Sequence, residues 1–503
     1  MSVLPCLLLA LLASAPQKSK SEAKAFAGAW MTTLGPMQLA AKGTNVAGHY
    51  GWGEEGEVEG KLEGGRLVFT WRGPAGKGDG WFELWKDGAT FTGESTFPGG
   101  KESWGGYRRE PREAKPEPGQ VTDGQTKSGL EYHLRVPKGF DRKKRYTAVA
   151  LLHGSNAASR DYVEGFPGNW PELAERYILV GFDGERLSGA SRDGKRAFNA
   201  TYVEFSGHDV GEPGRKNQTP WLLAQALEQL GKELPIERWY VTGHSQGGFL
   251  TLAVAMFYPE RIAGAIEVAG NLLVQCEPDF FDDEKLKAAQ RRVPIAIVHG
   301  EKDTVVEYSA ATYTFDSLDD GGFPALRLFN APKVGHPWAF LPVDEALLWL
   351  DELNAGGGAE LAEHAERALD EERYRDASAL LARAREHGKD PALAPRLAAL
   401  SERLDAAARP EAAALAKAMG GKDGAWVDRF WEFRARFGAT PAAEDVLADY
   451  ARLRAKHQKP AEERFYRARG LDSAEQKQAL YREIVAEYYA SRWYRLVKGW
   501  IKP

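Results

Sequence analysis

Gly243 and Gly247 stand two residues before and two residues after Ser245, in the segment GHSQG. An apolar run with strand character precedes this segment, and an apolar run with helical character follows it. In such a strand-to-helix turn the serine occupies a strained backbone conformation and its hydroxyl projects above the edge of the sheet, while glycines on either side avoid a clash between strand and helix. The segment predicts a nucleophile elbow with Ser245 as the nucleophile; an ordinary glycine-rich turn is the alternative.

Such a serine needs a histidine and a carboxylate, because a hydroxyl is too weakly acidic to attack a carbonyl carbon unaided. With this kind of elbow, the acid and then the histidine follow the serine along the chain. Asp303 follows an apolar run and a glycine turn, in HGEKD, and His336 follows the next apolar run, in VGHPW. We therefore expect Asp303 to orient the imidazole of His336, and His336 to act as base and then as acid.

Other acids and histidines compete for these roles. Glu307 and Asp344 are the alternative acids, although the first is expected inside the next helix and the second follows the histidine. His208, upstream of the serine, is a candidate for lining the substrate cleft. We expect His299 to end its strand as a half-buried residue, and His244 to point to the other side of the elbow.

The tetrahedral intermediate of acyl transfer needs hydrogen-bond donors for its oxyanion, one just after the nucleophile and one from an early strand-end loop. Gln246 supplies the first backbone N–H group. The second is expected from the segment LLHGSN, where an apolar strand ends at a glycine. Ser155 is the favoured donor and Asn156 the alternative, and a plain tight connection is the competing interpretation of this loop.

Residues 120–355 must hold these groups in place. Near-continuous apolar runs alternate there with helical patterns, which predicts a mostly parallel sheet with flanking helices. The apolar runs are Tyr146–Leu152, Tyr177–Phe182, Trp239–Thr242, Ile262–Val268, Ile295–Val298 and Leu326–Phe329.

From about residue 126 to 353 the sequence resembles the α/β-hydrolase superfamily, in particular exported esterases of the feruloyl esterase and polyhydroxybutyrate depolymerase type. The resemblance rests on the elbow, the LLHGSN loop, the HGEKD loop and the segment FYPERIAGA. It implies hydrolysis of carboxylic esters through an acyl-serine intermediate, with aryl (feruloyl-type) esters among the expected substrates. The substrate would be a small ester or one derived from a polymer.

Two other functions stay open at this stage. A serine peptidase of the prolyl oligopeptidase type would use the same three residues, and a non-catalytic binding protein could keep the fold. No cofactor is expected, and no metal site, because no cluster has a ligand spacing such as His-Glu-x-x-His.

Two further domains are expected around the hydrolase. Residues 16–109 show alternating apolar residues between glycine turns, which predicts an antiparallel β-barrel or sandwich, and they resemble lipocalin-like modules. Their tryptophans either fill a small core or form a platform for sugars or aryl groups. The charged, proline-containing segment 110–119 is expected to be a semi-rigid linker.

Residues 356–503 are rich in Ala, Arg, Glu and Leu with helical periodicity, which predicts an all-α domain. The segment YRDA at residues 374–377 resembles the second helix of a tetratricopeptide unit. This domain is either a helical bundle packed on the hydrolase or a surface for a protein partner.

The chain of 503 residues has 66 Lys and Arg against 71 Asp and Glu, a net charge of −5, so nucleic acid is not an expected partner. Residues 1–15 form a short apolar segment ending in ASA, as in a signal peptide, which predicts export to the periplasm or medium; an uncleaved anchor is the alternative. No membrane span is expected in the mature protein. Of the two cysteines, Cys6 lies in this segment, so Cys276 has no disulfide partner.

Overall fold

The computed structural model describes residues 20–501, apart from residues 33, 52–55, 75, 87, 110–111, 129, 156, 185, 188–195, 198–218, 273–287, 388–390, 420–425 and 439. The chain forms two compact units, Met1–Trp239 and Tyr240–Pro503. The division falls within strand β16 (Ile236–His244).

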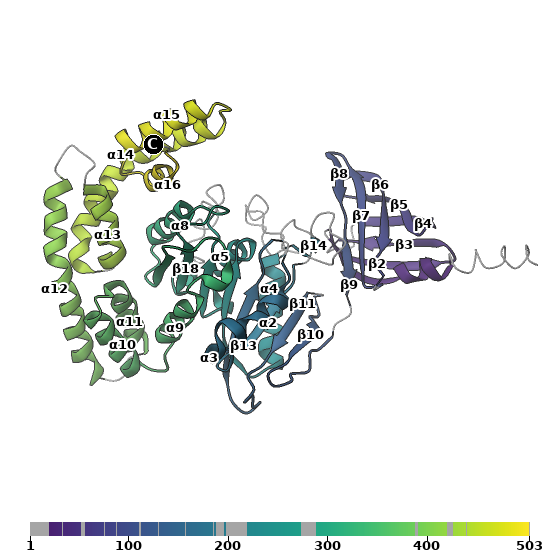
Figure 1. The fold of residues 1–503 in the computed structure, drawn as a ribbon, viewed down its shortest axis with the longest axis horizontal. Coiled ribbons are helices and arrows are strands. Elements are labelled where there is room, and N and C mark those ends of the chain that lie inside the picture. The colour runs from purple at the N-terminus through teal and green to yellow at the C-terminus, as the bar shows by residue number, and fades with distance from the viewer. Residues whose placement is uncertain are drawn as a thin grey trace, which may run out of the picture. The chain divides into compact units, whose positions relative to one another are not determined.

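The first unit begins with a closed antiparallel barrel, so the choice between barrel and sandwich is settled (Figure 1). The strands follow the order β6-β5-β4-β3-β2-β1-β9-β7, and a pairing between β6 and β7 closes the ring, while β8 extends β7 as a hairpin. These strands are β1 (Gly28–Thr32), β2 (Gly35–Lys42), β3 (Asn45–Tyr50), β4 (Gly56–Glu63), β5 (Arg66–Gly73), β6 (Gly76–Leu84), β7 (Thr90–Phe97), β8 (Gly100–Ser103) and β9 (Gly106–Arg108).

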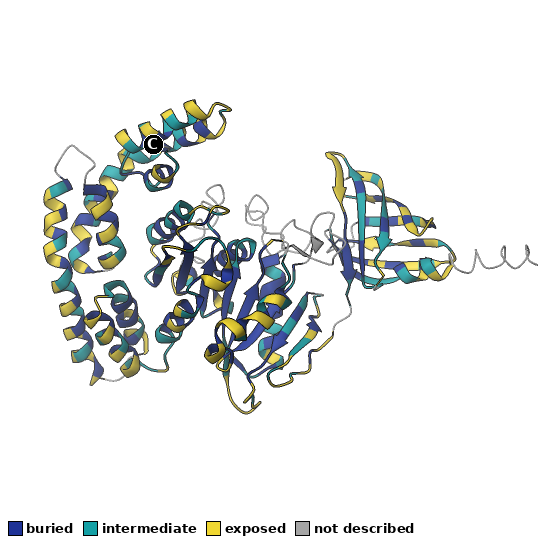
Figure 2. Ribbon diagram, viewed as in Figure 1, coloured by how far each residue is buried: buried dark blue, intermediate teal, exposed yellow. Residues whose placement is uncertain are grey.

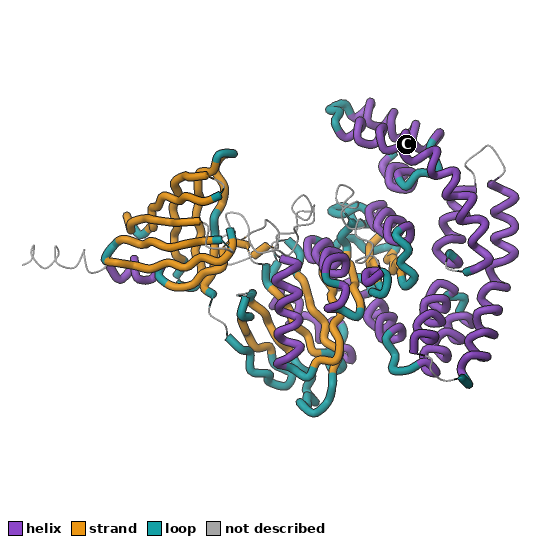
Figure 3. The backbone as a smooth tube through the Cα atoms, turned by 180° about the vertical axis from the view of Figure 1, so that it is seen from behind, coloured by secondary structure: helices purple, strands orange, loops and turns teal. Residues whose placement is uncertain are grey.

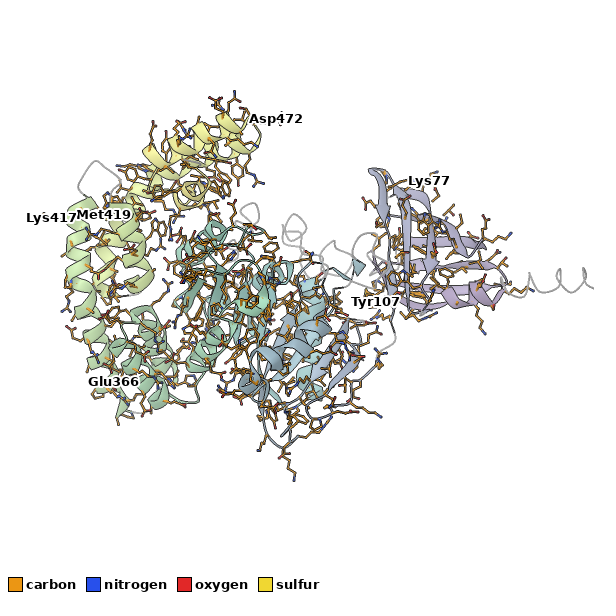
Figure 4. The ribbon with its side chains drawn as sticks, viewed as in Figure 1. Lys77, Tyr107, Glu366, Lys417, Met419 and Asp472 are labelled. Carbon is orange, nitrogen blue, oxygen red and sulfur yellow. The ribbon has the colours of Figure 1, made fainter. Side chains whose placement is uncertain are left out.

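Aromatic side chains fill the barrel. Trp30, Trp71 and Trp104 are almost fully buried in one cluster with Phe82 and Phe91. Among the described residues, these three tryptophans therefore belong to the barrel core, in agreement with the interpretation that the tryptophans fill a small core. Figure 4 labels Tyr107 on β9, which is also buried, and Lys77 on β6, which is exposed.

The rest of the first unit contains four strands of a mixed sheet, together with helices. Strand β13 pairs in parallel with β12 and antiparallel with β11, which pairs antiparallel with β10. Residues 112–119 lie along this sheet, since Arg112 pairs with Gln125 and the N–H of Gly119 donates to the carbonyl of Val136. The elements are β10 (Val121–Gln125), β11 (Glu131–Arg135), β12 (Tyr146–Leu152), α2 (Ser159–Asn169), α3 (Pro171–Ala174), β13 (Ile178–Phe182), β14 (Arg186–Leu187), β15 (Arg196–Ala197) and α4 (Thr219–Glu233).

The second unit contains four parallel strands in the order β16-β17-β18-β19, and helices α5, α8 and α9 pack on them. The interior strands are buried along their whole length, as near-continuous apolar sequence predicts for parallel strands (Figure 2). The elements after β16 are α5 (Gln246–Phe257), η2 (Pro259–Arg261), β17 (Gly264–Val268), β18 (Ile295–Gly300), α8 (Tyr308–Asp320), β19 (Leu326–Ala331), η3 (Trp338–Phe340) and α9 (Val343–Leu353).

The chain continues as helices only, from residue 358 to 500 within the described part (Figure 3). Buried alanines on α10 and α11 allow these two helices to approach closely. No helix in the described ranges has the length and apolar character to cross a membrane. The helices are α10 (Gly358–Asp370), α11 (Tyr374–His387), α12 (Leu393–Met419), α13 (Val427–Phe437), η5 (Pro441–Ala443), α14 (Glu444–Arg469), α15 (Ala474–Glu487) and α16 (Trp493–Trp500).

The helical region packs on helix α8 of the sheet. Asp319 of α8 pairs with Arg375 of α11 at 2.5 Å, and Asp316 pairs with Arg495 of α16 at 2.6 Å. The ring of Tyr313 stacks on Trp493 with centroids 5.8 Å apart. These contacts are those of a helical bundle packed on the sheet unit, which is one of the two expectations for this region. The resemblance to a tetratricopeptide unit stays a prediction.

Asp376 of α11 joins the helical region to two elements of the sheet unit. Its buried carboxylate accepts hydrogen bonds from Trp349 of α9 (2.9 Å), Arg327 of β19 (2.9 Å) and Arg373 (2.7 Å). Asp376→Ala is expected to lower the free energy of unfolding by about 3 kcal/mol, because it leaves a buried indole N–H and two guanidinium groups without this acceptor. Chemical denaturation measures the effect.

The matched control is Asp370→Ala, which removes an aspartate whose side chain is 61% exposed and pairs with Arg403. It is expected to cost about 0.5 kcal/mol or less. Equal effects of the two substitutions would contradict the linking role of Asp376.

Candidate functional site

Ser245, Asp303 and His336 all follow the carboxyl ends of parallel strands in the second unit. The serine comes directly after β16, and the register pairs His244 with Val268 of β17 and Val268 with Val298 of β18. Asp303 follows β18 and His336 follows β19. Loops at the carboxyl ends of parallel strands meet at one edge of the sheet, which is where such sheets bind ligands.

Ser245 has the strained backbone expected of an elbow, with φ 53° and ψ −115°. Its N–H donates to the carbonyl of Val268 at 2.8 Å, which ties the turn to the neighbouring strand. A Cβ atom on Gly243 would lie 2.2 Å from the carbonyl oxygen of Gly247, so only glycine fits there. This close approach lets the chain turn directly from β16 into α5.

The imidazole of His336 bonds to Asp303, with 2.7 Å between Nδ1 and Oδ2. The other carboxylate oxygen, Oδ1, accepts the backbone N–H groups of Val305 (2.8 Å) and Val306 (2.9 Å). The Asp303 side chain is fully buried, whereas that of His336 is 19% exposed. A carboxylate held in this way fixes the ring orientation and favours the tautomer with its proton on Nδ1, which leaves Nε2 to act as base.

The loops that carry these two residues lie in close contact. The N–H of Lys302 donates to the carbonyl of Val334 at 2.9 Å. A Cβ on Gly300 would come within 2.4 Å of the carbonyl oxygens of Val334 and Gly335. Glycine at position 300 is therefore what allows Asp303 to reach His336.

Two further histidines surround this pair. Burial lowers the pKa of His244 to about 4, so its ring is neutral at neutral pH and its Nε2–H donates to the backbone carbonyl of His336 at 2.7 Å. The rings of His244 and His336 lie 4.7 Å apart, so the expectation that His244 points to the other side of the elbow is wrong. His299 is fully rather than half buried; burial lowers its pKa, and its Nε2–H donates to the carbonyl of Val306 at 2.8 Å.

The two expected oxyanion donors lie in different compact units. Gln246 is the first residue of α5, at the positive end of the helix dipole. Ser155 is exposed in the turn after β12, next to Gly154, whose N–H donates to the hydroxyl of Tyr162. The alternative donor, Asn156, lies outside the described residues.

The remaining candidates do not touch His336 in the described contacts. Glu307 is exposed immediately before α8, and Asp344 lies in the first turn of α9. His208 and Cys276 lie outside the described residues. Within the ranges that the structure describes, no group of three or more His, Cys, Asp or Glu side chains could hold a metal ion.

Sequence reasoning missed Glu267, a fully buried acid on β17. Burial raises its pKa to about 8, so the carboxyl is mostly protonated at neutral pH. The signal was present in the sequence, because Glu267 is the one charged residue in the apolar run AGAIEVAG.

Comparison with known proteins links this part of the chain to ester hydrolases. Residues 216–320, which include Ser245 and Asp303 but not His336, match the profile of a family described as phospholipase/carboxylesterase. A stretch of 109 residues is 28% identical to acyl-protein thioesterase 1 of Neurospora crassa, covering 22% of this chain and 43% of that protein. An alignment over 109 residues is 32% identical to a protein of Oryza sativa subsp. japonica named probable carboxylesterase, covering 22% of this chain and 39% of that protein.

The chain therefore spans less than half the length of these two curated relatives. Among solved structures, a thermostable esterase is 18% identical, with 59% of this chain and 74% of that chain covered and a TM-score of 0.34. An acetyl xylan esterase from Aspergillus awamori is 15% identical, with 46% and 99% covered and a TM-score of 0.35. Over residues 216–320, the chain is similar in sequence to the phospholipase/carboxylesterase family.

Proposed function

We propose that this protein hydrolyses carboxylic esters through an acyl-serine intermediate, with Ser245 as the nucleophile. The observation that carries the proposal is the hydrogen bond between His336 and a buried, backbone-held Asp303. His244, which precedes Ser245 in the strained elbow, bonds to the backbone carbonyl of His336. The sequence similarity of residues 216–320 to carboxylesterases supports the same reaction class.

In this mechanism, Ser245 Oγ attacks the ester carbonyl carbon while Nε2 of His336 accepts the hydroxyl proton. The tetrahedral intermediate carries an oxyanion, for which we propose the N–H groups of Gln246 and Ser155 as donors. When the C–O bond breaks, His336 returns the proton to the departing alcohol. Water then attacks the acyl-serine by the same route, which releases the acid and restores the hydroxyl. Asp303 stabilises the imidazolium in both halves.

For the substrate we propose esters with an aryl or other large apolar group, feruloyl-type esters among them. Two large apolar side chains next to the candidate residues support this: Val305 is 69% exposed in the Asp303 loop, and Phe340 is 72% exposed in the turn after His336. Exposed apolar side chains close to polar catalytic groups are typical of substrate sites.

The wider organisation is also a proposal. Residues 120–355 would form the α/β-hydrolase domain, preceded by a lipocalin-like domain at 16–109 with its connecting segment at 110–119, and followed by a tetratricopeptide-like helical domain at 356–503. Residues 1–15, outside the described part of the chain, would direct export.

Ser245→Ala tests the nucleophile. We expect it to lower ester hydrolysis by about 10³-fold or more, because the hydroxyl forms the covalent intermediate, with little change in melting temperature. A panel of p-nitrophenyl esters, feruloyl esters and peptide amides is assayed with both proteins. Residual activity at a tenth of the wild-type rate would refute the assignment, and preferential cleavage of the amides would indicate a peptidase instead.

Asp303→Asn tests the acid. We expect a loss of about 10³- to 10⁴-fold in kcat, since an amide in this place favours the wrong imidazole tautomer. Glu307→Gln is the matched control, because Glu307 is exposed on the same loop and should leave kcat unchanged. A larger loss from Glu307→Gln than from Asp303→Asn would transfer the role to Glu307.

Phe340→Ala tests whether the exposed apolar side chain at position 340 contacts the substrate. Loss of contact with a phenyl ring is expected to lower kcat/KM for feruloyl and long-chain esters by about 10-fold, while acetyl esters change little. Tyr466→Ala on α14 is the control, since it removes an exposed aromatic ring from the helical region. An equal loss for all esters would contradict a role in specificity.

A further inference from the structure

Glu267 lies inside the sheet, directly beside the candidate elbow. Its side chain is fully buried on β17, and the strand register sets it opposite Gly243 of β16 on one side and Ile297 of β18 on the other. A carboxyl group is costly to bury among apolar strands unless it is neutral or paired. Apolar packing alone therefore does not explain an acid at this position.

The carboxyl holds the loop that supports the elbow. The N–H of Gly270 donates a hydrogen bond to Glu267 Oε1. Within the same loop, the carbonyl of Val268 accepts the N–H of Ser245 at 2.8 Å. A Cβ on Gly248, in the first turn of α5, would lie 3.0 Å from the oxygen of Val268 and 3.3 Å from Cα of Gly270. Backbone contact thus transmits the position of residues 268–270 to the turn that carries Ser245.

The protonation state of this carboxyl matters because a second acid is nearby. Burial, together with the negative charge of Asp303, raises the pKa of Glu267 to about 8, although the hydrogen bond from Gly270 lowers it. Among the described residues, Oε2 has no hydrogen-bond partner. Within the described part of the chain, the groups that shift the pKa of Glu267 include no cation. Burial lowers the pKa values of His244 and His299, the two histidines near Asp303.

We propose that Glu267 is a positioning residue. As a neutral carboxylic acid it fixes residues 268–270 beneath Ser245 and Gln246. Loss of its proton at alkaline pH displaces this support and slows the reaction of Ser245. The inference rests on the proposed serine hydrolase function and adds an alkaline limit to it. An ionised Glu267 would set a second buried negative charge near Asp303, which the surroundings do not stabilise.

The raised pKa of Glu267 makes the stability of the folded protein depend on pH in a defined direction. The pKa of Glu267 in the folded protein, about 8, lies above the ordinary value of 4.5. The folded state therefore holds the proton more tightly, and stability falls as the pH rises from 4.5 towards 8. A glutamine at this position has no proton to lose, so it removes this part of the pH dependence.

The test compares Glu267→Gln and Glu267→Leu in the full-length protein, with the rate of Ser245 labelling by a fluorophosphonate probe measured from below to above pH 8. Glutamine remains neutral and keeps an oxygen for the Gly270 N–H. We expect it to label within about threefold of wild type at neutral pH and to retain its rate above pH 8, where the wild-type rate falls. Leucine loses the acceptor and is expected to slow labelling and kcat by about 10²-fold, with little change in KM.

Asp316→Asn is the matched control, because Asp316 is another buried acid, with its pKa raised by burial to about 7, but it lies on α8 against Arg495. Its pH profile of labelling should follow wild type even if its melting temperature falls. A wild-type protein that the probe does not label would refute the proposed function. Two results with a labelled wild-type protein would refute the positioning role alone. One is a Glu267→Gln variant whose labelling rate falls above pH 8 as in wild type. The other is a folded Glu267→Leu variant that is labelled at the wild-type rate.

Discussion

The hydrogen bond between His336 and Asp303 sets the geometric requirement for the rest of the candidate site. It forms only if the loops after β18 and β19 meet, and they meet because these strands are parallel neighbours with Gly300 opposite Ala331. A side chain at position 300 would collide with the backbone of the second loop. The carboxylate must also point in one direction, which two backbone N–H groups on Oδ1 enforce. The strand register, Gly300 and the backbone amides of the loop thus together determine the geometry of this one hydrogen bond.

Parallel neighbours require a crossover, and here the crossover between β18 and β19 is helix α8. The outer side of α8 carries Asp316, Asp319 and Asp320, which pair with arginines of the helical region. Buried ion pairs contribute little net stability compared with apolar packing, but each leaves a costly unpaired charge if the partner is displaced. These pairs therefore define how the helices dock on α8. The helical region is in this sense part of the scaffold that holds the Asp303 and His336 loops.

The sequence predicted what depends on local pattern. The run Tyr146–Leu152 matches β12, and the apolar runs before Asp303 and His336 are strands β18 and β19. It did not predict β10 and β11, because VTDGQ and EYHLR are short and polar and their strand character comes from pairing with each other and with β13. The orientation of His244 was also wrong, since the acceptor of its ring N–H is the carbonyl of His336, which only the folded chain brings near.

The least predictable property is the charge of a buried acid. Asp303 and Glu267 both lie in buried surroundings at the same edge of the sheet, and residue type does not distinguish them. Asp303 has three hydrogen bonds, two from backbone N–H groups and one from an imidazole, which compensate a negative charge. Glu267 has one, from Gly270, which is too little to offset full burial. Two of the donors to Asp303 and the donor to Glu267 are backbone N–H groups, and the folded loops set the direction in which they point. The number of hydrogen bonds that each buried acid accepts is therefore set by the fold and not by the composition of the site.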